Sequence, residues 1–178
     1  MAGMRAFILT GTPGSGKTAI LRQLEANGHP VVEEAATDVI ALGQALGDPR
    51  PWETAGFVER ILGLQQRRRR VVEAYERDLV FFDRSPVCTL ALCRYAELPV
   101  PDGLLQAVDG YERTAFLVRN LGFVEPTAAR RITFEQSIGF ERIHEETYRE
   151  LGFDLVEVPP GALTERTELI ESATRVRP

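Results

Sequence analysis

The stretch GTPGSGKT at residues 11–18 constrains the fold of this chain more than any other segment. Its glycines, lysine and threonine follow the spacing G-x-x-x-x-G-K-[ST], the P-loop (Walker A) motif, whose backbone N–H groups surround phosphates. Apolar residues 7–9 precede it and predict a strand, and apolar residues at helical spacing follow it as far as Gly28. This strand–loop–helix order is the context in which the motif binds a nucleoside triphosphate.

Lys17 in this loop is the only lysine of the chain, since the other twenty basic residues are arginines. A compact ammonium group on a thin stem fits inside a loop wrapped round a phosphate, whereas a planar guanidinium does not. The motif predicts that Lys17 binds the β- and γ-phosphates and that the Thr18 hydroxyl ligates Mg²⁺. ATP and Mg²⁺ are therefore the expected cofactors, and no guanine-recognition motif is evident. The expected nucleotide-binding residues of the loop are Gly11, Thr12, Pro13, Gly14, Ser15, Gly16, Lys17, Thr18 and Ala19.

Composition narrows the remaining classes of protein. The 178 residues suit one domain, and no apolar run approaches the roughly 18–20 residues that span a bilayer. A net charge of −5 gives no general attraction to nucleic acid, and the four arginines at 67–70 spread round a helix as a mostly solvated face. Cys88 and Cys93 fit neither a zinc nor a C-x-x-C pattern. We expect a cytoplasmic protein, monomeric or homodimeric, with reduced thiols and with His29 and His144 as ordinary surface or core-edge residues.

Five apolar segments alternate with helical stretches along the chain. This alternation predicts an α/β fold of the P-loop NTPase type, with a five-stranded parallel sheet and helices on both faces. Ligands of such sheets bind at the carboxyl ends of the strands. The predicted strands are Arg5–Thr10, Pro30–Glu33, Leu79–Asp83, Ala115–Arg119 and Asp154–Val158.

Two longer connections set this chain apart from a minimal sheet. Residues 35–76 read as a helical insert for the acceptor, with one helix to about Leu46, a break at GDPRP, and a second helix from about Glu53 to Glu76. Residues 120–135 have the length of a lid.

A helix is expected after that lid segment. Thr133 and Gln136 have the spacing of a capping box that opens it. Its predicted apolar side consists of Ile138, Phe140, Ile143 and Leu151.

The third strand ends in Asp83-Arg84, beside the expected phosphate site. Motor-type P-loop ATPases usually carry a second acid directly after this aspartate, and an arginine there suits phosphoryl transfer to a hydroxyl instead. The carboxylate of Asp83 could hold Mg²⁺ or orient the acceptor, while Arg84 could neutralise charge on the phosphoryl group. The second strand ends in Glu33 and Glu34, of which Glu34 is the preferred general base. The alternative for these acids is a favourable interaction with a helix N-terminus.

Two weaker candidates complete the predicted site. Arg130 and Arg131 could enter with a closing lid and stabilise the transition state, although adjacent arginines are as often simply solvated. Pro160 follows the fifth strand, where a loop could pass under the adenine.

These features resemble a P-loop family of AAA domains that includes the nicotinamide-riboside kinase domain of NadR. More distantly, they are similar to deoxyribonucleoside kinases. The resemblance implies a kinase core with Glu34, Asp83 and Arg84 around the acceptor and Arg130 or Arg131 in the lid. It also matches Trp52 and Gln65 to family positions, which makes them candidate acceptor-binding residues. The segments that carry it are GTPGSGKT, VVEEAATDVI, DPRPWETAGFVERILGLQ, VFFDRSP, ARRITFEQS and YRELGFDLVEVP.

The sequence therefore predicts an ATP-dependent kinase that phosphorylates a hydroxyl of a small, nucleoside-like molecule. The lid reads TAARR, with Ala128 and Ala129, where the family carries D-x-x-R. This departure leaves open a nucleotide-binding switch or slow ATPase that acts through a protein partner. A phosphotransferase for an antibiotic or another natural product would use the same chemistry and is a third alternative.

Overall fold

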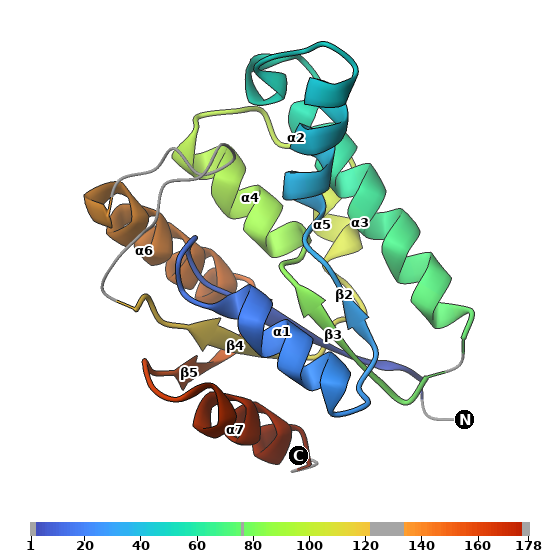
Figure 1. The fold of residues 1–178 in the computed structure, drawn as a ribbon. Helices are drawn as coiled ribbons and strands as arrows, with labels where there is room; N and C mark the ends of the chain where they lie inside the picture. Colours follow the sequence, from blue (N-terminus) through green and yellow to red (C-terminus); the bar gives the residue numbers. More distant parts are fainter. Residues whose placement is uncertain (1–2, 76, 122–133, 176–178) are drawn as a thin grey trace.

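A single parallel sheet organises the computed structural model, which describes residues 3–75, 77–121 and 134–175. Its order is β2-β3-β1-β4-β5, and each neighbouring pair is parallel (Figure 1). The predicted five-stranded parallel sheet is thus confirmed, with β4 displaced by one residue and β2 reduced to two. The strands are β1 (Arg5–Thr10), β2 (Val31–Val32), β3 (Leu79–Asp83), β4 (Thr114–Val118) and β5 (Asp154–Val158).

Helices cover both faces of this sheet, because the central strands are apolar on both sides. On β1, Phe7 and Leu9 pack in the cluster that includes residues of α1 and α7, whereas Ile8 packs in the cluster of α4 and α6. Burial of each such large side chain contributes roughly 1.5–3 kcal/mol. The helices are α1 (Lys17–Ala26), α2 (Ala35–Ala45), the 3₁₀ turn η1 (Pro51–Glu53), α3 (Phe57–Glu73), α4 (Pro86–Tyr95), α5 (Leu104–Ala107), α6 (Phe134–Glu150) and α7 (Leu163–Arg175).

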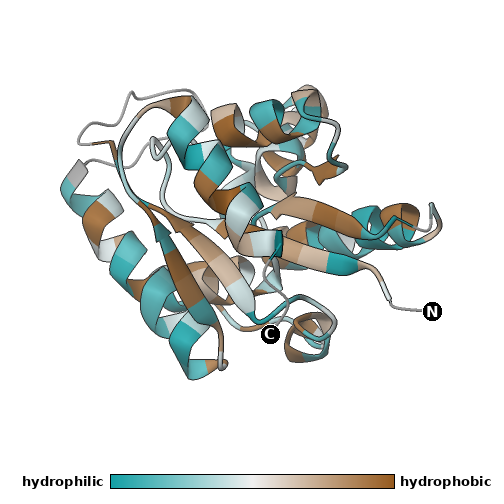
Figure 2. Ribbon diagram, turned by 90° about the horizontal axis from the view of Figure 1, so that it is seen from below, coloured by the Kyte–Doolittle hydropathy of each residue, from teal (hydrophilic) through white to brown (hydrophobic). Residues whose placement is uncertain are grey.

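The surface helices are amphipathic, as their packing on the sheet requires. Coloured by hydropathy, each of these helices carries both hydrophilic and hydrophobic residues, while the strands between them are mainly apolar (Figure 2). In the part of the chain that the structure describes, no helix is long and apolar enough to cross a membrane.

The helical insert between β2 and β3 contains the predicted break, but its second helix is shorter than expected. The break contains η1, and α3 begins at Phe57 instead of Glu53 because Gly56 before it has a left-handed φ of 78°. The helix ends at Glu73, three residues before the predicted end. Helices α2 and α3 pack on each other and on α4 through one apolar cluster. The insert therefore stands over the carboxyl ends of β2 and β3.

The buried side of α6 differs from the prediction. Phe140 is buried, but Ile138 is 51% exposed, so its assignment to the core was wrong. The buried positions include Ser137, His144 and Tyr148 instead, whose polar atoms bond to other elements. The apolar pattern of the sequence alone does not identify a buried helix face that contains polar residues. Thr133 lies outside the described residues, so the capping box stays a prediction.

Candidate active site

The P-loop joins β1 to α1 at the centre of the sheet, and its glycines are required by geometry. Gly11 has a φ of 132°, and a Cβ atom there would lie 2.3 Å from the backbone oxygen of Val118. Gly16 is the N-cap of α1 with a left-handed φ of 85°. The loop therefore brings backbone amides and the positive end of the α1 dipole together, as a phosphate site requires.

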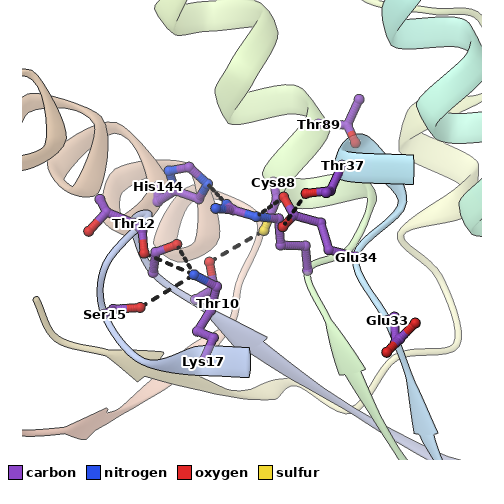
Figure 3. Close-up of polar contacts among 12 residues, drawn as sticks. Thr10, Thr12, Ser15, Lys17, Glu33, Glu34, Thr37, Cys88, Thr89 and His144 are labelled. Carbon is purple, nitrogen blue, oxygen red and sulfur yellow. Dashed lines mark hydrogen bonds and ion pairs between the residues drawn. The ribbon is translucent and has the colours of Figure 1, made fainter. Parts of the chain in front are cut away.

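Lys17 is buried and bends back over this loop. Its Nζ donates to the carbonyl oxygens of Gly11 and Thr12, both at 2.9 Å, and to Ser15 Oγ at 3.3 Å (Figure 3). Burial, and then the charge of Arg84, lower the pKa of Lys17 to about 8. The nearby carboxylates oppose this shift without cancelling it. The protonated form of Lys17 is consequently disfavoured by its surroundings, and an incoming phosphate would stabilise it.

Next to the P-loop, β3 ends at the buried Asp83, and the partly buried Arg84 follows it directly. Asp83 is 6% exposed and lies opposite Leu9 in the strand register. Arg84 has a φ of 68°, unusual for a residue other than glycine, and its amide donates to the Leu9 carbonyl at 2.9 Å. Such a conformation costs of order 1–3 kcal/mol and is concentrated at functional sites. Ser85 then caps α4 by accepting from the Val87 amide at 3.2 Å.

Arg84 forms an ion pair with Glu34, the N-cap residue of α2, with 2.7 Å between Nε and Oε1. Burial raises the pKa of Glu34, but the charges of Arg84 and Lys17 outweigh burial and hold this pKa below its usual value. Glu34 is thus a carboxylate at neutral pH and a hydrogen-bond acceptor more than a strong base. Glu33 points away from this cluster (Figure 3) and pairs with Arg22 outside it.

His144 was wrongly expected to be an ordinary surface or core-edge residue. It is fully buried, and its Nε2 lies 3.3 Å from Arg84 Nη1. Its position on α6, four residues before the buried Tyr148, is the only sequence signal that could have revealed it. His29, in contrast, packs edge-on against Phe81 at the core edge, as expected.

Cys88 was also absent from the predicted site, although it lies on the inner face of α4. Its Sγ is 3.3 Å from Thr10 Oγ1 and 3.2 Å from the hydroxyl of Tyr148. Burial raises the pKa of the Cys88 thiol. A hydrogen bond with His144 and the charges of His144 and Arg84 outweigh burial and lower this pKa to about 6.

One of the four consecutive arginines supports the site directly. Arg68 donates to the backbone oxygens of Glu33 and Glu34 at 2.8 and 2.9 Å and pairs with Asp38. Arg69 instead stacks on the ring of Tyr111 at 4.4 Å. The run is therefore neither a basic patch nor only a solvated face, because Arg68 fixes the junction between β2 and α2.

A cavity of about 600 Å³ connects the P-loop with the helical insert. Predicted residues that line it from the sheet edge are Lys17, Thr18, Glu34, Asp83 and Arg84. Trp52 and Gln65 line it from the insert, and Gln65 Oε1 accepts from Thr89 Oγ1 at 3.1 Å. The insert also contributes an apolar and aromatic wall, completed by α4 and α6: Ala36, Ile40, Phe57, Ile61, Leu92, Tyr95 and Phe140.

Pro13, Gly14 and Gly16 of the P-loop also line this cavity, whereas the remaining predicted residues do not line it or fall outside the described residues. Pro160 is exposed after β5 and does not line the cavity, so an adenine site there stays a prediction. Ala19 is exposed on α1. Arg130 and Arg131 fall outside the described residues, as does most of the predicted lid.

Thr18 and Asp83 line the same cavity and supply hydroxyl and carboxylate oxygens. Oxygen ligands of this kind suit Mg²⁺, which usually binds one or two carboxylates or hydroxyls together with phosphate oxygens and water. These residues therefore fit the metal that the P-loop implies.

Comparisons with known proteins agree with this arrangement. A family model described as an AAA domain matches residues 6–166. A frog virus 3 (isolate Goorha) protein, named as a candidate deoxynucleoside kinase, is 33% identical over 91 residues. The match spans 49% of this chain and 45% of the viral protein, so it covers less than half of that curated relative.

Solved structures with a similar fold include nucleoside and nucleotide kinases and NadR. NadR in complex with NR superimposes with a TM-score of 0.74 at 16% identity, over 98% of this chain and 50% of NadR. Thymidylate kinase from Ehrlichia chaffeensis gives 0.65 at 11% identity, over 98% and 100% of the two chains. Deoxyadenosine kinase from M. mycoides with bound products gives 0.61 at 15% identity, over 96% and 98%.

Identities this low establish the fold alone, whereas the family match covers most of the chain. The family match and the P-loop geometry point the same way. The chain belongs to the AAA domain family whose model spans residues 6–166, and it has a P-loop kinase fold with kinase-like relatives.

Proposed function

We propose that this protein is an ATP-dependent kinase that transfers the γ-phosphoryl group to a hydroxyl of a small, nucleoside-like acceptor. The observation that carries the proposal is the 600 Å³ cavity, which has the phosphate loop at one end and an aromatic wall at the other. A water-activating ATPase has no need of an apolar compartment beside its phosphates. Pockets of this size and lining typically bind small organic molecules.

The charged groups between the two ends suit phosphoryl transfer. Lys17 and the loop amides would bind the β- and γ-phosphates, and Arg84 would neutralise charge on the transferred group. Glu34 would accept a hydrogen bond from the acceptor hydroxyl and orient it for attack. A loose transition state asks little of a base, which is compatible with the lowered pKa of Glu34.

Mg²⁺ would be held by Thr18 and by Asp83, directly or through water, and would supply charge neutralisation between the β- and γ-phosphates. In the acceptor region, about residues 35–76, Trp52 would form one wall of the pocket for the acceptor ring. Gln65 Oε1 already accepts a hydrogen bond from Thr89. The amide N–H groups of Gln65 would therefore donate to an oxygen or nitrogen atom of the acceptor molecule. Roles for Arg130 and Arg131 in a lid, a single domain over residues 1–178 and a cytoplasmic location belong to the same proposal.

The test is detection of a phosphorylated product by mass spectrometry after incubation with Mg·ATP and separate nucleosides, vitamin ribosides, amino sugars and natural-product alcohols. Arg84→Ala should lower kcat by about 100-fold or more, as loss of a group that stabilises transition-state charge does. Asp83→Asn should have a comparable effect, whereas Arg67→Ala on the exposed side of α3 should not. If Asp83→Asn and Arg84→Ala both left turnover unchanged, the site assignment would be wrong.

A panel without any phosphorylated product, combined with tight ATP binding, would instead favour a nucleotide-binding switch or slow ATPase. A product formed only from an antibiotic or another natural product would keep the reaction but change the substrate class.

A further inference from the structure

The fully buried imidazole of His144 has contacts at both ring nitrogens. Nδ1 lies 2.9 Å from the backbone oxygen of Phe140, one turn earlier on α6, and Nε2 lies 3.3 Å from Arg84 Nη1. A carbonyl oxygen can only accept a hydrogen bond, and a guanidinium nitrogen can only donate one. Both contacts are therefore satisfied by a single form, the neutral ring with its proton on Nδ1 and a lone pair on Nε2.

The ring is also fixed in orientation. It packs edge-on against Phe140, with 4.2 Å between ring centroids and an interplanar angle of 80°. Its acceptor lone pair is thus aimed by packing and by the Nδ1–H bond, not by the arginine that it contacts. Second contacts of this kind commonly set which nitrogen of a histidine is protonated.

Arg84 is consequently held from two different elements. Glu34, at the N-terminus of α2, pairs with Nε, while His144, on α6, faces Nη1. An ion pair at one nitrogen alone would let the guanidinium plane rotate about that contact. A hydrogen-bond acceptor at Nη1 removes this freedom, as preorganised transition-state stabilisation requires.

A competing arrangement exists, because Cys88 is close to His144 and its thiol pKa is lowered to about 6. A proton transferred from the thiol to the imidazole would produce a thiolate and an imidazolium. Nε2 would then carry a proton and could no longer accept from Arg84. The protonation state of Nε2 distinguishes the two arrangements.

We propose that His144 is a positioning residue: as the neutral Nδ1–H form, it accepts a hydrogen bond from Arg84 Nη1 and fixes the guanidinium plane beside the phosphate loop. This inference rests on the proposed function, in which Arg84 neutralises the transferred phosphoryl group. His144 acts through Arg84 and need not touch a substrate.

The hydrogen bond is tested first by ¹⁵N NMR of the histidine side chains in the full-length protein at pH 7.5. The chain has two histidines, so a His29→Gln variant assigns the remaining signals to His144. The proposal expects an unprotonated Nε2 and a protonated Nδ1. A protonated Nε2, whether in an imidazolium or in the opposite tautomer, would overturn it.

The positioning role is tested with a matched pair of substitutions. His144→Gln can place an amide oxygen near the position of Nε2, whereas His144→Asn can reach only the region of Nδ1. Both variants lose the aromatic ring, so they share any general packing defect. Thermal melting and Mg·ATP affinity, measured on both, record that shared defect.

Turnover is measured with Mg·ATP and deoxyadenosine, adenosine or nicotinamide riboside as acceptor probes. His144→Gln should keep kcat within about threefold of the wild type, and His144→Asn should lose about tenfold or more, with the KM for Mg·ATP unchanged in both. Equal losses in the two variants would overturn the positioning role. Wild type without turnover on these probes would count against the proposed function, while the Nε2 signal would still decide the hydrogen bond.

Discussion

The affinity of this protein for ATP should fall as the pH rises from 7 to 9, because Lys17 loses its proton in this interval. Its side chain is 6% exposed, and burial is the main cause that lowers its pKa from 10.5 to about 8. Phosphate oxygens bound to Nζ stabilise the ammonium form. The nucleotide complex therefore retains the proton that the free protein gives up.

The size of the effect follows from this pKa. If only the ammonium form binds, the apparent dissociation constant is multiplied by one plus the ratio of neutral to charged lysine. With a pKa of about 8 this factor is about 1.1 at pH 7, about 2 at pH 8 and about 11 at pH 9. ATP binding should thus weaken about tenfold between pH 7 and pH 9, or by about 1.4 kcal/mol.

Titration calorimetry with Mg·ATP in two buffers of different ionisation enthalpy gives both the affinity and the proton balance. At pH 8 we expect uptake of about half a proton for each nucleotide bound. A Cys88→Ser variant is the control for the nearby thiol, whose lowered pKa of about 6 lies below the range from pH 7 to pH 9. Absence of proton uptake at pH 8, together with a constant affinity from pH 7 to pH 9, would refute the reasoning.

The effect of Lys17 on folding stability has the opposite sign to its effect on the affinity for ATP. The folded-state pKa of Lys17 lies below the unfolded value, so the unfolded chain binds more protons between pH 8 and 10.5. The contribution of Lys17 to stability therefore rises with pH over that window, while the affinity for ATP falls. Thermal melts of the free protein at each pH check that it remains folded.

Two further predictions concern residues around the loop and the insert. Gly11→Ala should lower the free energy of unfolding, measured in urea, by about 2–4 kcal/mol, because the added Cβ would meet the Val118 carbonyl. Gly28→Ala is the control, since Gly28 also has a positive φ but has open space around it, and this change should cost about 1 kcal/mol. Similar costs for both would refute the steric argument. Arg68→Gln should reduce kcat/KM for the acceptor about threefold to tenfold by loosening the β2–α2 junction, whereas the exposed Arg67→Gln should have little effect. Steady-state kinetics of the two variants decide this, and equal activities would contradict it.

The parallel sheet was predictable because its strands carry their signal locally. The apolar runs before Thr10 and Asp83 are buried on both faces, and their ends match the predicted bounds. The P-loop likewise consists of consecutive residues. Where a strand is only two residues long, as at Val31–Val32, the apolar pattern overestimates its length.

The polar contacts around Arg84 were only partly predictable. Asp83, Arg84 and Glu34 could be proposed because strand order places strand ends together. The approach of His144 depends on which face of α6 turns toward the sheet, and hydrogen bonds decide that face as much as apolar burial does. The wrong placement of Ile138 in the core has the same cause.

The central claim is acceptor-dependent phosphoryl transfer, and ADP production from Mg·ATP tests it most directly. It should be measured for the wild type and for Lys17→Ala, without acceptor and with each member of the nucleoside, riboside, amino-sugar and natural-product panel. The proposal predicts turnover that appears with one acceptor class and disappears in Lys17→Ala. Tight ATP binding with a low rate that no acceptor changes would contradict it.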